Sequence, residues 1–246
     1  MMRWEDLEVP SPWRLEVVDQ LDSTNEELKR RADLQHGEVL LAKRQTAGKG
    51  RRGAAWHAVP GESLTFSAVV RPAVPRMSWS RLALAAGVAV AEALEEIRLR
   101  PQIKWPNDVL IHGRKICGIL VEATPEVAIV GIGVNLGNQG FRDELDGVAT
   151  SVFLENGEEV DSAEFLVALL ASLHRWSDEI GEGFPSLLEQ VRMRCALTGR
   201  RVSLKTVDGG QQGVVEGISD RGELLLETLT GRHAYLQADE VRVVGP

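Results

Sequence analysis

The segment from residue 103 to residue 136 places four short apolar runs in succession, with only tight turns between them. The runs lie at 103–105, 109–111, 115–122 and 127–136. Pro, Asn, Asp, Gly and Thr fill the gaps, as is typical of turns between strands. A doubly wound fold instead needs a helical crossover between successive parallel strands. The segment therefore predicts an α+β fold built on a mixed β-sheet with helices.

Further helical and strand patterns flank this segment. Strands are predicted at 14–18, 38–44 and 63–70, and helices at 25–34, 79–97, 162–180 and 185–196. Ser23 and Thr24 are each followed three residues later by a glutamate, which is the spacing of a capping box at the start of the first helix. Gly37 is the expected end of that helix.

The sequence changes character near residue 198. From residue 201, short runs of Val, Leu and Ile alternate with turns that contain glycine, which predicts four or five small antiparallel strands. A barrel of this size buries only a small hydrophobic core by itself, and we therefore expect it to pack against the larger domain. We therefore expect a large domain at 1–197 and a small β-barrel domain at 198–246.

Composition excludes several classes of protein. Hydrophobic residues make up 43% and charged residues 26%, as in soluble globular proteins, and the net charge of −8 argues against a protein that coats nucleic acid. The two cysteines, Cys117 and Cys195, form no CxxC pair, which indicates a reduced, cytoplasmic protein. The first residues lack the pattern of a secretory signal, and the apolar run at 82–91 is too short to span a membrane.

The most unusual stretch is T-A-G-K-G-R-R-G at 46–53. Its glycines fit the dinucleotide fingerprint, but a Pro-Gly pair and a strand follow where a helix is required. The P-loop pattern fails because no Ser or Thr follows Gly-Lys. Lys49, Arg51 and Arg52, with no carboxylate from 39 to 56, instead suit a ligand with several anionic oxygens, and Trp56 could stack on a base. A solvated basic loop is the alternative, and a single-stranded nucleic-acid platform would need more aromatic residues.

Two further motifs point to a ligand. Lys104 and Lys115 lie within apolar strand sequence, where a lysine is costly unless it meets a negative partner. An edge-strand lysine that reaches solvent is the other interpretation of Lys115, and 106–108 alone would be an ordinary turn. In G-I-G-V-N-L, Gly131 and Gly133 leave two positions of a strand without side chains, which often marks close approach of a ligand to the backbone.

Together these motifs resemble those of the biotin protein ligases. The matching motifs, in the family's order, are S-T-N at 23–25, Q-T-A-G-K-G-R-R-G at 45–53 with Trp56, K-W-P-N-D at 104–108, R-K-I-C-G-I-L-V-E at 114–122 and G-x-G-x-N at 131–135. The resemblance implies a sheet like that of class II aminoacyl-tRNA synthetases, with a C-terminal SH3-like barrel. It also implies a reaction in which biotin and ATP form biotinyl-5′-AMP, and a carrier lysine then displaces AMP.

The resemblance also implies roles for individual residues. Arg51 and Lys49 would clamp the carboxylate and the phosphate, Lys115 would hold their oxygens together, and Asp108 would orient the incoming amine. Biotin and its adenylate would be bound by Ser23, Thr24, Asn25, Gln45, Gly48, Lys49, Gly50, Arg51, Lys115 and Gly118. The nucleotide would contact Trp56, Lys104, Asn107 and Asn135, with Mg²⁺ accompanying ATP; no side chain is assigned as a metal ligand.

The chain departs from the family pattern at two positions of the loop. Lys49 stands where arginine is usual and Ala54 where a basic residue is common, so we expect weaker coupling between adenylate binding and loop order. The short stretch before the first strand leaves no room for the helix-turn-helix of some members, so no operator DNA binding is expected.

The expected partner is a biotin carboxyl carrier protein. An edge strand could pair with that carrier or with a second subunit, so a homodimer stays open. A lipoate or octanoate ligase or transferase is the nearest alternative function, and a non-catalytic module that binds biotin or nucleotide is another.

Overall fold

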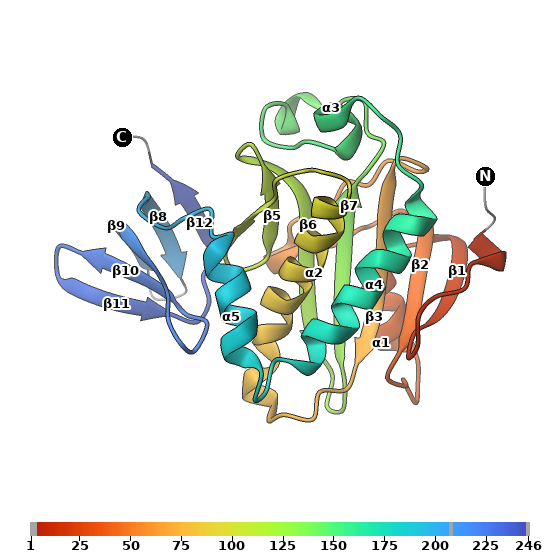
Figure 1. The fold of residues 1–246 in the computed structure, drawn as a ribbon, viewed down its shortest axis with the longest axis horizontal. Coiled ribbons are helices and arrows are strands. Elements are labelled where there is room, and N and C mark those ends of the chain that lie inside the picture. Colours follow the sequence, from red (N-terminus) through yellow and green to blue (C-terminus); the bar gives the residue numbers. More distant parts are fainter. Residues whose placement is uncertain (1–3, 207–208, 245–246) are drawn as a thin grey trace.

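The computed structural model describes residues 4–206 and 209–244, and it contains two β-sheets (Figure 1). The larger sheet has the strand order β1-β2-β3-β7-β6-β5-β4, and the smaller has the order β11-β10-β9-β8-β12. The larger sheet comprises β1 (Arg14–Leu21), β2 (Glu38–Gln45), β3 (Ser63–Val70), β4 (Gln102–Lys104), β5 (Asp108–Ile111), β6 (Arg114–Ala123) and β7 (Ala128–Asn135). The smaller comprises β8 (Arg201–Thr206), β9 (Gly209–Ile218), β10 (Leu224–Thr228), β11 (Gly231–Tyr235) and β12 (Glu240–Val243).

The larger sheet is mixed, which confirms the predicted fold class. β1 and β2 run parallel and are joined through α1 (Thr24–Arg30), whereas every other neighbouring pair is antiparallel. The four strands β4 to β7 form the predicted run of hairpins. The smaller sheet is antiparallel with five strands, within the range predicted and consistent with an SH3-like domain.

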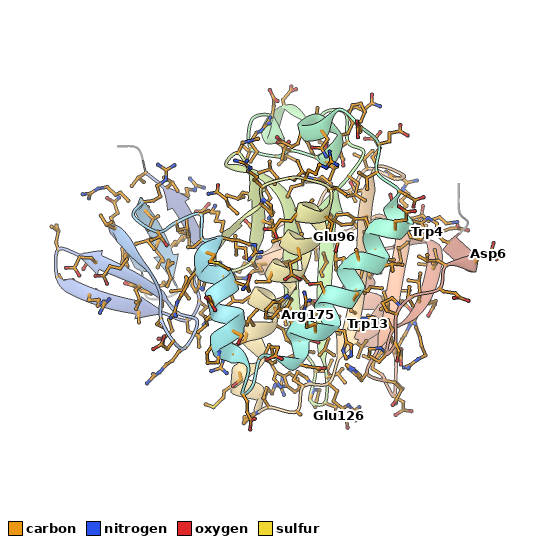
Figure 2. All side chains as sticks on the ribbon, viewed as in Figure 1. Trp4, Asp6, Trp13, Glu96, Glu126 and Arg175 are labelled. Atoms are coloured by element: carbon orange, nitrogen blue, oxygen red, sulfur yellow. The ribbon has the colours of Figure 1, made fainter. Side chains whose placement is uncertain are left out.

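One face of the larger sheet is covered by α2 (Leu82–Glu96), α4 (Ser162–Asp178) and α5 (Phe184–Met193) (Figure 1). The alanine-rich α2 has small side chains on most of its surface, so it lies close to both the sheet and α4. The carboxylate of Glu92 on α2 accepts hydrogen bonds from Ser172, Arg175 and Trp176 of α4. Arg175 lies on α4 beside α2 in Figure 2. The two helices are therefore joined by polar as well as apolar contacts.

The core helix was predicted at 79–97, and α2 spans Leu82–Glu96. With the preceding 3-10 turn η3 (Arg76–Arg81), α2 makes a 21-residue stretch that is long and apolar enough to cross a membrane by length and composition alone. Within the molecule, 67% of its most apolar window is buried. The apolarity of this stretch is thus used in contacts with the sheet and α4.

The smaller sheet packs against the larger unit next to α5 (Figure 1). The indole Nε1 of the buried Trp105 donates a 3.0 Å hydrogen bond to the carbonyl of Gly222, and Arg192 Nε donates to the carbonyl of Ile218 at 2.9 Å. Gly222 has a φ of 85° and lies against Phe184 and Leu84, where a side chain would be crowded. The small sheet is thereby held beside the K-W-P-N-D turn; the domain boundary at 197 and 198 stays a prediction.

The first helix differs from its prediction. α1 ends at Arg30 rather than at 34, and its N-cap, Ser23, makes no side-chain cap hydrogen bond. The predicted capping box is wrong because other side chains accept from the backbone N–H groups that the two glutamates would have bound. Asp22 Oδ1 accepts from the Ser23 N–H and Gln45 Oε1 from the Thr24 N–H, both at 2.8 Å. Gly37 does not end this helix either.

Gly37 instead precedes β2, with a φ of 89°. A side chain there would clash with the carbonyl of Pro12. Several short elements were not predicted, namely α3 (Val152–Asn156) and the 3-10 turns η1 (Trp4–Asp6), η2 (Arg51–Gly53) and η4 (Asp143–Leu145).

Candidate active site

A cavity of about 210 Å³ lies where the start of α1, the end of β2, the glycine-rich loop and the K-W-P-N-D turn meet. It brings together most of the residues that the sequence singled out. It is lined by Ser23, Thr24, Asn25, Gln45, Lys49, Gly50, Arg51, Ala54, Ala55, Trp56, Thr65, Phe66, Asn107, Asp108, Lys115, Gly118, Ile119, Leu120, Gly131, Ile132, Gly133 and Asp239. The polar and charged side chains in this set come from segments at 23–25, 45–51, 65, 107–108, 115 and 239.

One end of the cavity is a network of buried hydrogen-bonding groups. Gln45 Oε1 accepts from the backbone N–H of Thr24 at 2.8 Å and from its hydroxyl at 3.2 Å. The Ser67 hydroxyl, fully buried on β3, lies 2.6 Å from Thr24 Oγ1 and 2.5 Å from Asn25 Oδ1. The hydroxyls of Thr24 and Ser67 carry two hydrogens between them for the three oxygen–oxygen contacts of this network. This end of the cavity therefore has more acceptor positions than hydrogens.

Asn25 is held on both sides of its amide. Its Nδ2 donates to Glu122 Oε2 at 2.8 Å and to the carbonyl of Leu120 at 3.3 Å, which fixes Oδ1 toward Ser67. Its amide lies directly over Gly131, where any side chain would clash. The glycine predicted to admit a ligand thus admits Asn25.

Trp56 forms an apolar wall of the cavity. Its ring lies against the backbone of Gly133 and Gly118, so a side chain at Gly133 would overlap the indole. Lys115 Nζ lies 5.8 Å from the centre of the ring, within range of a cation–π contact. The indole Nε1 is buried and has no hydrogen-bond acceptor among residues 4–206 and 209–244.

Two cations, Lys115 and Arg51, line the cavity beside the K-W-P-N-D turn. Lys115 Nζ lies 2.6 Å from Asp108 Oδ1, so this strand lysine has the negative partner that its position requires. Arg51 donates from Nη1 to Asn107 Oδ1 at 3.2 Å and from Nη2 to the carbonyl of Ala238 at 3.1 Å. Burial, reinforced by the neighbouring Arg52, lowers the pKa of Arg51, while Asp108 opposes this shift. An arginine starts from so high a pKa that it stays charged.

The glycine-rich loop is tied down on two sides. Lys49 Nζ forms a 2.8 Å ion pair with Glu26 Oε1 on α1, and Arg52 forms an ion pair with Asp239 beside β12. The loop also closes on itself, because the Gly50 N–H donates to the carbonyl of Ala54 at 2.6 Å. The cations of this loop are thus held by specific partners, which argues against a merely solvated basic loop.

Three predicted site residues lie outside the cavity lining. Gly48 packs under Trp56, whose carbonyl a side chain would meet. Lys104 is half-buried on β4. Asn135 follows Gly133 on the same face of β7; its Nδ2 donates to the carbonyl of Thr150 at 3.0 Å, while its buried Oδ1 has no partner among the described residues. The roles given to these three residues stay predictions.

Sequence reasoning missed several contributors, among them Ser67, Glu122, Glu26, Ala238 and Asp239. Ser67 had a signal, because the run at 63–70 places polar residues at 63, 65 and 67, which is one face of a strand. Asp239 had none, since it lies 187 residues from Arg52, in the segment between β11 and β12.

Comparison with known proteins decides the family. A model of the biotin/lipoate A/B protein ligase family matches residues 17–138, and a model of the biotin protein ligase C-terminal domain matches residues 197–239. The biotin--[acetyl-CoA-carboxylase] ligase of Mycobacterium tuberculosis is 35% identical, over 94% of this chain and 90% of its own. This chain belongs to the biotin protein ligase family. The C-terminal match is specific to biotin ligases, so the activity is ATP-dependent ligation of biotin, and a lipoate or octanoate enzyme is not favoured.

Other biotin ligases support this assignment. The bifunctional ligase/repressor BirA of Bacillus spizizenii is 34% identical, over 91% of this chain and 71% of its own. A biotin protein ligase from Aquifex aeolicus, solved in complex with biotin and ATP, superimposes with a TM-score of 0.85 at 30% identity and covers 94% of this chain and 99% of its own. The structural match to the Aquifex aeolicus enzyme therefore extends over both sheets of the ligase described here.

Proposed function

We propose that the buried polar end of the cavity binds the ureido ring of biotin. A ureido group carries two N–H donors and one carbonyl, and the acceptor-rich set of Thr24, Gln45 and Ser67 suits such donors. Ser23, also buried and in the lining, would complete the contacts. This excess of acceptors is the observation on which the proposal rests.

The same feature discriminates against lipoate and octanoate. Their ring and tail have no N–H group, so they would form no such hydrogen bonds with Thr24 and Gln45. Each polar group that a ligand covers without a hydrogen bond costs about 1–3 kcal/mol, which is about 5- to 150-fold in affinity. We therefore expect biotin to be preferred at binding as well as in catalysis.

Adenylation joins two anions, and the loop and strand cations would offset their repulsion. A carboxylate oxygen of biotin attacks the α-phosphorus of ATP, and the bond to pyrophosphate breaks. Arg51 and Lys115 both line the cavity and contact the adjacent residues Asn107 and Asp108, so a carboxylate and an α-phosphate bound there would contact both cations. Fixed cations stabilise charge that develops in the transition state. Lys49 would add a third positive charge on the loop side.

The second step would transfer biotin to a carrier lysine. The amine nitrogen attacks the carboxyl carbon of the mixed anhydride, and the bond to AMP breaks. Asp108 lines the cavity, and its ion pair with Lys115 orients its carboxylate, so it would accept a hydrogen bond from the incoming amine. By analogy with the Mycobacterium tuberculosis relative, we propose the biotin carboxyl carrier domain of acetyl-CoA carboxylase as the acceptor.

The nucleotide would occupy the side of the cavity near Asn107, Trp56 and the end of β7. A Mg²⁺ carried mainly by phosphates would fit here, because the buried Oδ1 of Asn135 has no partner among the described residues and would be available to such an ion. When bound, the metal would neutralise phosphate charge. Arg51, Lys115 and Asn107 would meanwhile orient the reacting oxygens.

The size of the cavity implies that the loop moves during the cycle. Its volume of about 210 Å³ lies below the ~300–1,000 Å³ of typical ligand pockets. Trp56 and Arg51 line this cavity, so the loop that carries them would open to admit biotin and ATP. Closure of the loop afterwards would keep water from the mixed anhydride.

Both free cysteines suit a reducing compartment, and we propose the cytoplasm as the location.

Mass spectrometry of a carrier domain tests this function. Purified protein, biotin, ATP and magnesium should add one biotin to the carrier, and a carrier variant with its acceptor lysine changed to arginine should stay unmodified. Adenylate formation without transfer to the carrier would refute the proposed acceptor.

A further inference from the structure

The two arginines of the glycine-rich loop both end on one short segment of the small sheet. Arg51 Nη2 donates to the carbonyl of Ala238, and the side chain of Arg52 forms an ion pair with Asp239. These two residues lie between β11 and β12, so the contacts join the loop to a unit that begins about 150 residues later in the chain. Ala238 and Asp239 thereby form a fixed point for the loop.

This segment is itself rigidly placed. The Asp239 N–H donates to the carbonyl of Lys205 on β8 at 2.7 Å, and Ala238 and Val241 on either side are buried in the core. The Asp239 side chain is only 16% exposed and lines the cavity. Its carboxylate is therefore presented to the loop by the small sheet, and not by a flexible tail.

The backbone of Arg52 gives an independent sign that the loop is held. Arg52 has a φ of 55° and a ψ of 36°, in the left-handed region that residues other than glycine seldom adopt. Such a conformation persists where the surroundings fix it. The ion pair with Asp239 is the side-chain contact that fixes Arg52 in the closed loop.

We propose that Asp239 is a positioning residue that latches the loop over biotinyl-5′-AMP and slows its escape before transfer. This inference deepens the proposed function and rests on it. With the latch intact, Arg51 stays between Asn107 and Ala238 and faces the cavity. Without it, Arg52 loses its partner and the loop opens more often. The small sheet would thus contribute to retention of the intermediate, in addition to packing against the large sheet.

Release of biotinyl-5′-AMP from preformed complex, followed after a chase of unlabelled adenylate, tests the latch. Asp239→Asn should release it about fivefold faster, the scale of one partly exposed ion pair. Asp239→Glu should restore slow release in part, because it keeps the charge. Glu240→Gln is the matched control: this neighbouring carboxylate is exposed and pairs with Arg242, so release should be unchanged.

A second variant separates the latch from a general loss of folding. Arg52→Gln should speed release as much as Asp239→Asn does, and the double variant should be no faster than either alone. Biotin-dependent pyrophosphate exchange is measured on the same samples. Loss of exchange in the unaltered protein would contradict the proposed function itself. Normal exchange with unchanged release in Asp239→Asn and Arg52→Gln, or additive effects in the double variant, would overturn the latch.

Discussion

Replacing Lys115 by methionine should cut biotin-dependent pyrophosphate exchange about 100- to 1,000-fold, the scale for losing one preorganised charge stabiliser. Methionine keeps most of the apolar stem that packs near Trp56 and removes only the charge. The structure supports the upper part of this range. Lys115 Nζ lies 2.6 Å from Asp108 Oδ1, and its loss leaves a carboxylate that is 20% exposed facing the incoming anions. Lost attraction and added repulsion thus act in the same direction.

The assay measures exchange and biotin affinity on the same protein. Because Lys115 acts on charge that develops in the transition state, kcat should fall much further than biotin affinity, which depends on the buried polar end of the cavity. Lys115→Arg should retain more activity than the methionine variant. Lys43→Met is a control, since Lys43 pairs with Asp19 on the surface. Exchange within about threefold of the unaltered protein would remove Lys115 from the mechanism.

Three further predictions concern the cavity and its loop. Ser67→Ala should weaken biotin binding about tenfold in calorimetry, because it removes the hydroxyl that orients Thr24 and Asn25; equal affinity would show that the network does not need it. Lys49→Arg should slow adenylate release roughly two- to threefold, because an arginine can make a bidentate contact with Glu26 where the lysine makes a single one. Faster release would contradict this. Hydrogen bonds from Lys29 and Lys49 lower the pKa of Glu26 from its ordinary 4.5. A depressed carboxylate pKa stabilises the folded state above the ordinary value and loses that contribution as the pH falls through the folded value. The difference in thermal midpoint between the unaltered protein and Glu26→Gln should therefore be largest above pH 4.5 and shrink below it, whereas a constant difference would refute the role of this charge.

The mixed sheet was predictable because its signals are local. Turn residues separate the runs that became β4 to β7, and alternation or continuous apolarity marks each strand. The capping box at Ser23 and Thr24 failed because Asp22 and Gln45 compete for the same amides. Gln45 lies about twenty residues away, so spacing within the helix could not reveal it.

The site was predictable only in part, for a similar reason. Gly131 was expected to lie close to a ligand, but the Asn25 amide packs against it instead. A glycine in a strand leaves space beside the backbone without specifying which group occupies that space. Lys115 was expected to need a negative partner and has Asp108. The partners of Lys49 and Arg52 come from α1 and the small sheet, and only the tertiary fold brings these carboxylates to the loop.

Pyrophosphate exchange with magnesium and ATP, with biotin, lipoate or octanoate added separately, tests the central claim most directly. The claim is that an acceptor-rich pocket selects biotin and that Arg51 and Lys115 activate it. We predict exchange that depends on biotin alone. Exchange with lipoate or octanoate would contradict the assignment of the buried polar end, and no exchange with any acid despite measurable binding would contradict the catalytic roles of Arg51 and Lys115.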